Sequence, residues 1–108
     1  LWNGWMPGDA PASHEKMLRD DTLYDLGIEI RHNQDPVRPG MGSCIFMHIR
    51  EKPTCTTAGC TAMDSASLHD IVRWVRPSKD IRLVQLPLPV YQARRKNWCL
   101  PRISPRFN

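Results

Sequence analysis

The sequence predicts a small α+β domain, and three patterns along its 108 residues support that fold class. Between Leu23 and Ile30, apolar side chains alternate with Gly27 and Glu29, as expected of a strand with one buried face. From Ser43 to Ile49 the chain is apolar on both faces apart from one histidine, which is typical of a strand covered on both sides. Asp64 or Ser65 can cap a helix whose apolar residues recur at helical spacing. These residues are Leu68, Ile71, Val72 and Val75.

Turn residues and caps predict the remaining segments. Residues 1–12 are rich in Gly, Pro and Trp and predict an irregular entry segment. Ser13 can cap a short helix that runs through Met17 and Leu18 and ends near Asp20 and Asp21. Residues 33–42 contain the Pro, Gly and Asn that favour a loop. Residues 81–86 predict another strand, and residues 89–98 predict a last helix with a proline in its first turn.

The net charge of +4 lies at the C-terminal end of the chain. Residues 1–90 hold ten basic and eleven acidic side chains, whereas residues 91–108 hold five basic side chains and no acidic one. We therefore expect no nucleic-acid partner, and the tail is either a solvated end or is attracted to an anionic polymer or membrane.

No run of about 18 apolar residues occurs, so no membrane-spanning segment is expected. No signal peptide occurs, and the chain begins at Leu1 instead of Met, which is typical of a fragment or a processed product, so any export signal is expected upstream.

Two residues are candidates for chemistry. His48 is the polar side chain in the central strand, where it is either a hydrogen-bonded core residue or a catalyst. Cys60 follows Gly59 in a turn, and glycine there allows backbone N–H groups to face an oxyanion. An imidazole beside a thiol favours the thiolate, which attacks acyl groups. A hairpin-like return of the loop would bring the two side chains together, whereas the alternative for Cys60 is a buried, unreactive thiol.

The other cysteines are Cys44, Cys55 and Cys99, and four cysteines allow three disulfide pairings. The spacing Cys55-x4-Cys60 lacks the tight pairs of a zinc ribbon, so no metal is expected. Cys55 is a resolving thiol, a disulfide partner or a bystander, and the bystander role is favoured because its spacing demands no partner. Strand alternation puts Cys44 on the same face as His48.

The segment from Gly42 to Asp64, G-S-C-I-F-M-H-I-R-E-K-P-T-C-T-T-A-G-C-T-A-M-D, resembles the active-site stretch of the YkuD-type L,D-transpeptidase catalytic domain, in a divergent branch with T-A-G-C at the nucleophile. The flanking motifs S-H-E-K-M, R-D-D-T-L-Y and V-Q-L-P are also similar, so the resemblance covers nearly the whole chain. It implies a mainly antiparallel, twisted sheet with two or three short helices. The family domain has further strands upstream, so residues 1–100 are expected to form its C-terminal half, N-terminally truncated, with 101–108 as a basic tail.

The resemblance implies cysteine-dependent acyl transfer on peptidoglycan stem peptides, through a thioester on Cys60 with His48 as the base. It assigns Gly59 to the oxyanion hole and gives Ser43 a supporting place near the histidine strand. It also implies a monomer in the cell envelope or periplasm that needs no metal or organic cofactor. Alternatives are an L,D-carboxypeptidase on the same site and a non-catalytic, cell-wall-binding fragment.

Two residues depart from the better-known members of that family. Ala58 stands where those members have a histidine, and Ala62 stands where they usually have an arginine. Both alanines fit the divergent branch. The missing arginine is expected to matter most for how a substrate is oriented.

Overall fold

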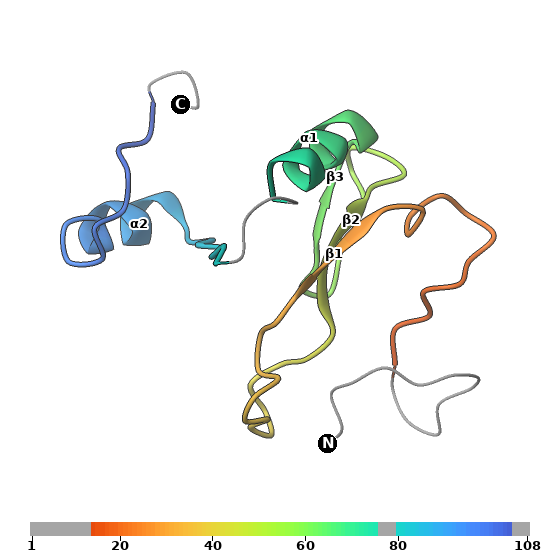
Figure 1. The fold of residues 1–108 in the computed structure, drawn as a ribbon, viewed down its shortest axis with the longest axis horizontal. Coiled ribbons are helices and arrows are strands. Elements are labelled where there is room, and N and C mark those ends of the chain that lie inside the picture. Colours follow the sequence, from red (N-terminus) through yellow and green to blue (C-terminus); the bar gives the residue numbers. More distant parts are fainter. Residues whose placement is uncertain (1–13, 76–79, 105–108) are drawn as a thin grey trace.

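The computed structural model describes residues 14–75 and 80–104, which form a small α+β structure (Figure 1). In chain order, its elements are β1 (Gly27–Ile30), β2 (Ile45–Ile49), β3 (Thr61–Met63), α1 (Ser65–Val75) and α2 (Leu88–Arg94). The α+β class is confirmed, with two short helices among the described residues. Neither helix is long and apolar enough to cross a bilayer.

The sheet has the order β1-β2-β3, with β2 in the middle. β1 runs antiparallel to β2, with Gly27 paired to His48 and Ile30 to Ile45. β3 runs parallel to β2, with His48 paired to Ala62. The sheet is therefore mixed, and the expectation of a mainly antiparallel sheet is wrong in this respect. Parallel pairing requires a crossover, so the chain between β2 and β3 does not make the expected hairpin-like return.

The central strand β2 is the most buried part of the sheet. Phe46, Met47 and His48 are consecutive and all buried, which puts buried side chains on both faces of the strand. On β1 only one face is covered: Ile28 and Ile30 are half-buried, whereas Gly27 and Glu29 are exposed. The predicted positions of both strands are confirmed, with shorter bounds.

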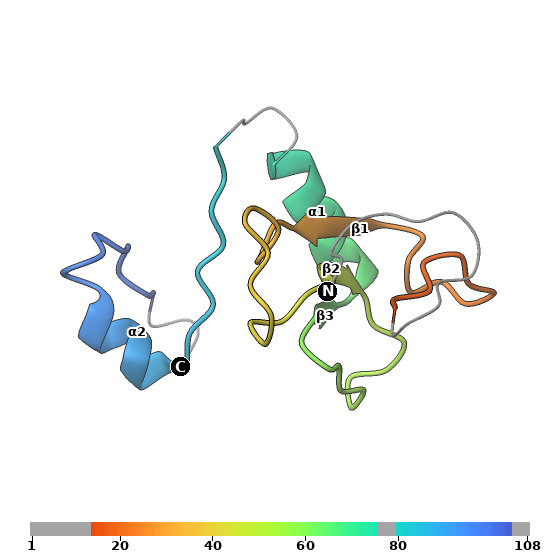
Figure 2. The ribbon, with the colours of Figure 1, turned by 90° about the horizontal axis from the view of Figure 1, so that it is seen from below.

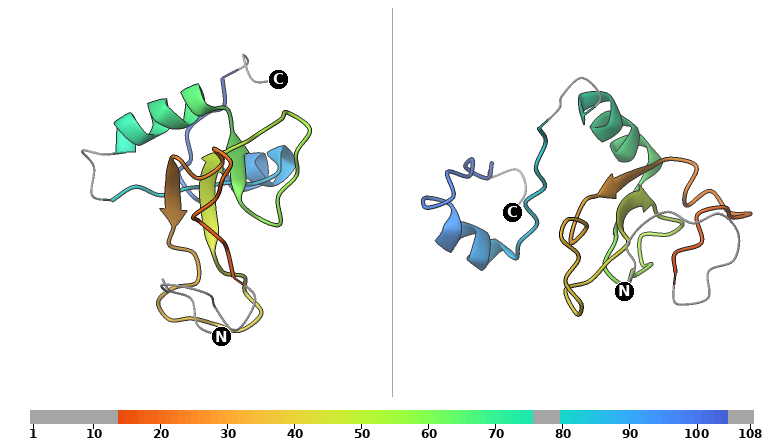
Figure 3. Two further views of the ribbon diagram at one scale, coloured as in Figure 1. Left: turned by 90° about the vertical axis from the view of Figure 1, so that its right-hand side faces the viewer. Right: turned by 60° about the horizontal axis from the view of Figure 1, so that its bottom comes forward.

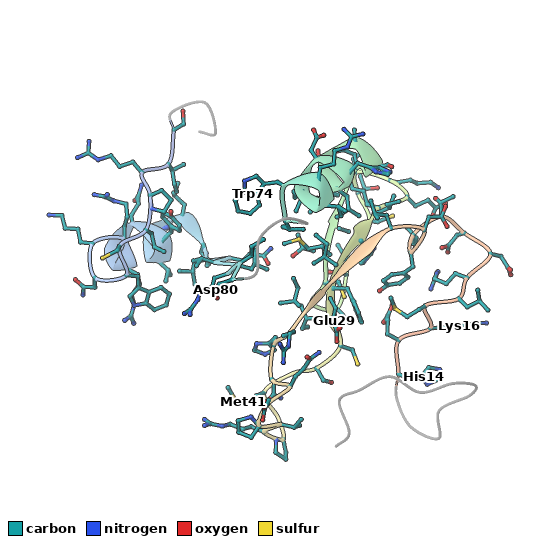
Figure 4. The ribbon with its side chains drawn as sticks, viewed as in Figure 1. His14, Lys16, Glu29, Met41, Trp74 and Asp80 are labelled. Atoms are coloured by element: carbon teal, nitrogen blue, oxygen red, sulfur yellow. The ribbon has the colours of Figure 1, made fainter. Side chains whose placement is uncertain are left out.

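Helix α1 begins directly after β3 and covers β2 (Figure 2). Of the two predicted caps, Asp64 is the one observed. Its two carboxylate oxygens accept hydrogen bonds from the backbone N–H of Ser67, at 2.9 Å, and from the Ser67 hydroxyl, at 2.8 Å. Leu68 is fully buried at 0% exposure and completes the core with Phe46 and Met47. Trp74 lies near the C-terminal end of the helix and is 70% exposed (Figure 4).

The predicted strand at 81–86 does not form, because these residues pair with no strand among the described ones. The segment is extended but exposed, and Ile81, Leu83 and Val84 face solvent. Its link to the sheet is a hydrogen bond of 2.9 Å from the Thr61 hydroxyl to the side-chain oxygen of Gln85. Residues 80–104, including α2, therefore lie to one side of the sheet (Figure 3). The last helix forms, but it ends at Arg94 instead of near Trp98.

The N-terminal segment lies on the other side of the sheet (Figure 1). Residues 14–21 form no helix, so the helix predicted from Ser13 to about Asp21 is wrong over this range, while Ser13 itself lies outside the described residues. A helix of about two turns fixes many dihedrals for few hydrogen bonds, so it does not form without support from packing. Glu15 instead bonds the Tyr24 hydroxyl. The predicted entry segment 1–12 and tail residues 105–108 also lie outside the described residues.

The loop between β1 and β2 is held by one asparagine. The amide nitrogen of Asn33 donates to the carbonyls of Arg38, at 2.9 Å, and Gly42, at 2.7 Å, and its side-chain oxygen accepts from the Arg38 backbone N–H at 2.7 Å. Asn33 itself has a φ of 54°, a left-handed conformation that asparagine tolerates better than most residues. The predicted loop at 33–42 is confirmed. It returns the chain to Cys44, next to the site described below.

The cap at Asp64 leads to a stability prediction. Hydrogen bonds from Ser67 lower the pKa of the Asp64 carboxyl, so the folded state favours the ionised form. Its contribution to stability is present above the ordinary carboxyl pKa and is lost as the pH falls through the lowered folded-state value. Asp64→Ala should lower the melting temperature at pH 7, and the difference from the unaltered chain should shrink in acid. Thermal melts followed by circular dichroism would measure this, with Asp20→Ala as the exposed control; an equal loss from both variants would contradict it.

Candidate active site

An open cavity of about 360 Å³ lies between the N-terminal segment, the strand β2 and the loop that precedes β3. All four predicted site residues, Ser43, His48, Gly59 and Cys60, line it. The other lining residues are His14, Glu15, Tyr24, Cys44, Ile45, Thr56, Thr57 and Ala58. Figure 4 shows His14 beside Lys16 on the N-terminal segment, whereas Met41 marks the far tip of the β1–β2 loop.

The register of the sheet explains why His48 and Cys60 share this cavity. His48 is paired with Ala62 across the parallel β2–β3 ladder, so the two side chains project from the same face. Cys60 precedes Ala62 by two residues, and side chains two apart on an extended chain point the same way. Cys60 is thus displaced from His48 by about one strand spacing across the ladder and two residues along it. Cys60 and His48 therefore line one cavity through a parallel crossover instead of a hairpin.

His48 is a buried polar side chain with a defined hydrogen bond. It is 8% exposed, and its Nδ1 lies 2.7 Å from the backbone carbonyl oxygen of Ile49. A carbonyl only accepts, so Nδ1 carries the proton in this contact. In the neutral ring the other nitrogen, Nε2, is then unprotonated and can accept a proton. This tautomer is the one that a general base requires.

Cys60 sits in a turn braced by Thr57. The Thr57 hydroxyl donates to the Cys60 carbonyl at 2.5 Å and accepts from the Gly59 backbone N–H at 3.4 Å. The Cys60 side chain is half-buried, and its thiol faces the carbonyl oxygen of Cys44, with 3.7 Å between sulfur and oxygen. The thiol therefore lies at the cavity wall with its sulfur partly accessible.

Gly59 has little room for a side chain. Its φ is 156°, and a Cβ built on it would lie 3.3 Å from the Cδ1 atom of Ile45. A larger residue would have to move Ile45 at the start of β2 or turn the backbone before Cys60. Glycine at this position therefore lets the turn lie close against the central strand.

Cys44 differs from its expected placement. It lies just before β2 and has a φ of 55°, so strand alternation does not determine its face. It nevertheless lines the cavity with His48, and its backbone carbonyl contacts the Cys60 thiol. Cys55 and Cys99 are exposed, and all four cysteines are free, so no disulfide links them.

Tyr24 and Glu15 belong to the site, although sequence reasoning gave them no chemical role. Burial raises the pKa of the Tyr24 hydroxyl, and its hydrogen bond to Glu15 and the nearby charges of Glu15 and Cys60 raise it further. Tyr24 lies three residues before Gly27, which pairs with His48, so the β1–β2 register carries it to the imidazole. That register is not visible in the sequence, where a lone tyrosine in a polar stretch gives no signal.

Among the residues that the structure describes, no cluster of three or more His, Cys, Asp or Glu side chains has the arrangement of a metal site. Comparisons with known protein families, with curated proteins and with solved structures gave no match to this chain. The assignment of chemistry to the cavity therefore depends on the residues that line it.

The hydrogen bond at His48 Nδ1 leads to a prediction about its tautomer. At a pH where the ring is neutral, His48 should be protonated at Nδ1, whereas exposed histidines should show the other tautomer or a mixture. Side-chain ¹⁵N–¹H correlation spectra would distinguish the protonated from the bare nitrogen, and a His48→Gln variant would assign the signal. A proton on Nε2 of His48 would show that this ring cannot accept the Cys60 proton as described.

Proposed function

We propose that this chain is a cysteine-dependent acyltransferase that acts on peptidoglycan stem peptides, with Cys60 as nucleophile and His48 as general base. The main observation is that one cavity brings together a partly accessible thiol and a buried imidazole whose Nδ1 proton is already engaged. The substrate class comes from the resemblance of residues 42–64 to L,D-transpeptidase sequences. The proposal implies a protein that works in the cell envelope.

The first half-reaction forms a thioester. The Cys60 thiol gives its proton to Nε2 of His48, and the thiolate attacks the carbonyl carbon of the scissile peptide bond. The C–N bond of the tetrahedral intermediate then breaks. The terminal residue leaves as an amine, taking the proton from the imidazolium. Reaching Nε2 requires the thiol to turn away from the Cys44 carbonyl, which at 3.7 Å holds it only weakly.

The oxyanion of this intermediate needs donors close to Cys60. The Gly59 N–H is a candidate donor, because its contact with Thr57 is long at 3.4 Å and can be exchanged for a stronger bond to a charged oxygen. Ser43 lines the same cavity and offers a hydroxyl. Replacing such a donor typically costs about 100- to 1000-fold in rate in other acyl-transfer enzymes.

Water and an amine compete for the thioester. Residues 51–59 are all exposed, so the approach to Cys60 is open to solvent. This exposure favours hydrolysis, and hence a carboxypeptidase, as the second candidate function. In both cases the acyl group is transferred from Cys60, and the products distinguish the two: a cross-linked dimer from amine attack, or a shortened stem from water.

The nucleophile is tested with a β-lactam of the carbapenem type. The Cys60 thiolate should open the lactam ring, forming an S–acyl bond as the C–N bond breaks and the ring nitrogen gains a proton. Intact-mass measurement should show one adduct on the unaltered chain and none on Cys60→Ser, because a hydroxyl with the same base is a far poorer nucleophile. His48→Gln should slow adduct formation by about 100-fold or more, since the base is lost.

Cys55→Ser is the matched control, because the same substitution is made in the same exposed loop. It should acquire the adduct at the unaltered rate. An adduct that survives in Cys60→Ser and disappears in Cys55→Ser would overturn the assignment of the nucleophile.

A further inference from the structure

The Tyr24 ring is packed against the general base. Its centroid lies 4.8 Å from that of the His48 imidazole, with the planes tilted by 38°. The Tyr24 ring also contacts Phe46 edge to face, with the ring centroids 5.9 Å apart and the ring planes at 84°. Aromatic pairs at these separations are favourable, so the tyrosine ring restricts the plane of the imidazole.

The Tyr24 hydroxyl shares the cavity with two acidic groups, Glu15 and Cys60. It donates a hydrogen bond of 2.6 Å to Oε1 of Glu15. Burial raises the pKa of the Tyr24 hydroxyl above its ordinary value, and the neighbouring Glu15 and Cys60 raise it further. The hydroxyl therefore keeps its proton through neutral pH. A hydroxyl has a single proton, so it can donate to Glu15 or to the Cys60 sulfur, but not to both.

We propose that Tyr24 is a third catalytic residue, which transfers its hydrogen bond from Glu15 to the Cys60 sulfur when the thiolate forms, and that Glu15 is a positioning residue that opposes this transfer. The inference rests on the proposed role of Cys60 as nucleophile. The bond to Glu15 holds the hydroxyl in the cavity that Cys60 also lines, while the carboxylate charge disfavours a second negative charge nearby. The remaining titratable side chains that line the cavity are His14 and Cys44 besides the base, His48.

This arrangement predicts opposite effects from two conservative changes. Tyr24→Phe keeps the ring on His48 but removes the donor to the thiolate, so Cys60 should become reactive only at higher pH. Glu15→Gln removes the negative charge and frees the tyrosine proton for the sulfur, so Cys60 should become reactive at lower pH. If Tyr24 and Glu15 had only a structural role, the two substitutions would not shift the pH at which Cys60 becomes reactive in opposite directions.

The readout is the pH dependence of alkylation by iodoacetamide, in which the Cys60 sulfur bonds to carbon and iodide leaves. Cys55 and Cys60 lie on the same tryptic peptide, so the measurements use a Cys55→Ser background. Peptide mass spectrometry then gives the rate at Cys60, with exposed Cys99 as the internal reference. The matched controls are Tyr91→Phe, which removes a hydroxyl bonded to Pro101, and Glu29→Gln, on the exposed face of β1.

We expect the midpoint of the Cys60 profile to rise by about one pH unit in Tyr24→Phe and to fall by a similar amount in Glu15→Gln, which is about a tenfold change in thiolate fraction at a fixed pH. Both controls should leave it unchanged. Glu15 is exposed, so the Glu15→Gln variant should fold. If Tyr24→Phe does not fold, the shift of the Cys60 midpoint in Glu15→Gln alone tests the inference.

Two results would overturn the inference. In the first, Cys60 in the unaltered chain is alkylated faster than Cys99, but the two variants either leave the midpoint of the Cys60 pH profile unchanged or shift it in the same direction. Tyr24 and Glu15 then do not act as described, whereas the assignment of Cys60 as nucleophile is unaffected. If Cys60 reacts no faster than Cys99 at any pH, the proposed nucleophile fails and this inference fails with it.

Discussion

Parallel pairing between β2 and β3, with His48 level with Ala62, places the two residues that the proposed chemistry needs on one face of the sheet. If the ladder slipped by one residue, Cys60 would point to the other face, because strand side chains alternate. The register is held at the end of the ladder by the bond of 2.8 Å from the Arg50 N–H to the Met63 carbonyl. It is supported further by α1, which follows β3 directly and buries Leu68 against β2. The cavity is thus a consequence of strand register and of one small core.

The buried histidine connects that core to the cavity. An unpaired polar group in the interior costs about 1–3 kcal/mol, and the carbonyl of Ile49 offsets this cost at Nδ1. The same bond selects the tautomer that leaves Nε2 to act as a base. Tyr24 packs on the imidazole ring from one side, and it lines the same cavity as Cys60. One side chain is therefore both part of the core and the centre of the proposed chemistry.

The sequence predicted those elements whose signals are local. The apolar run around Phe46, the cap at Asp64 and the helical spacing that includes Leu68 each depend on neighbouring residues, and each corresponds to an observed element. The parallel direction of β3 was missed because it depends on the path of residues 50–60, which carry no periodic pattern. The strand at 81–86 was wrong because alternation predicts an extended chain but provides no partner for it. Tyr24 and Glu15 were missed because long-range register, not spacing, carries them to His48.

The most direct test of the central claim is whether folding makes Cys60 more reactive than an ordinary exposed thiol. The alkylation rates of Cys60 and Cys55, separated by fragmentation of the tryptic peptide that carries both, would be measured at neutral pH in the native chain, in the native His48→Gln variant and in concentrated urea. The account predicts that native Cys60 reacts faster than Cys55, although Cys55 is the more exposed, and that the advantage disappears in the variant and in urea. If native Cys60 reacts more slowly than Cys55 and speeds up on unfolding, it is a protected core thiol and the site is not catalytic.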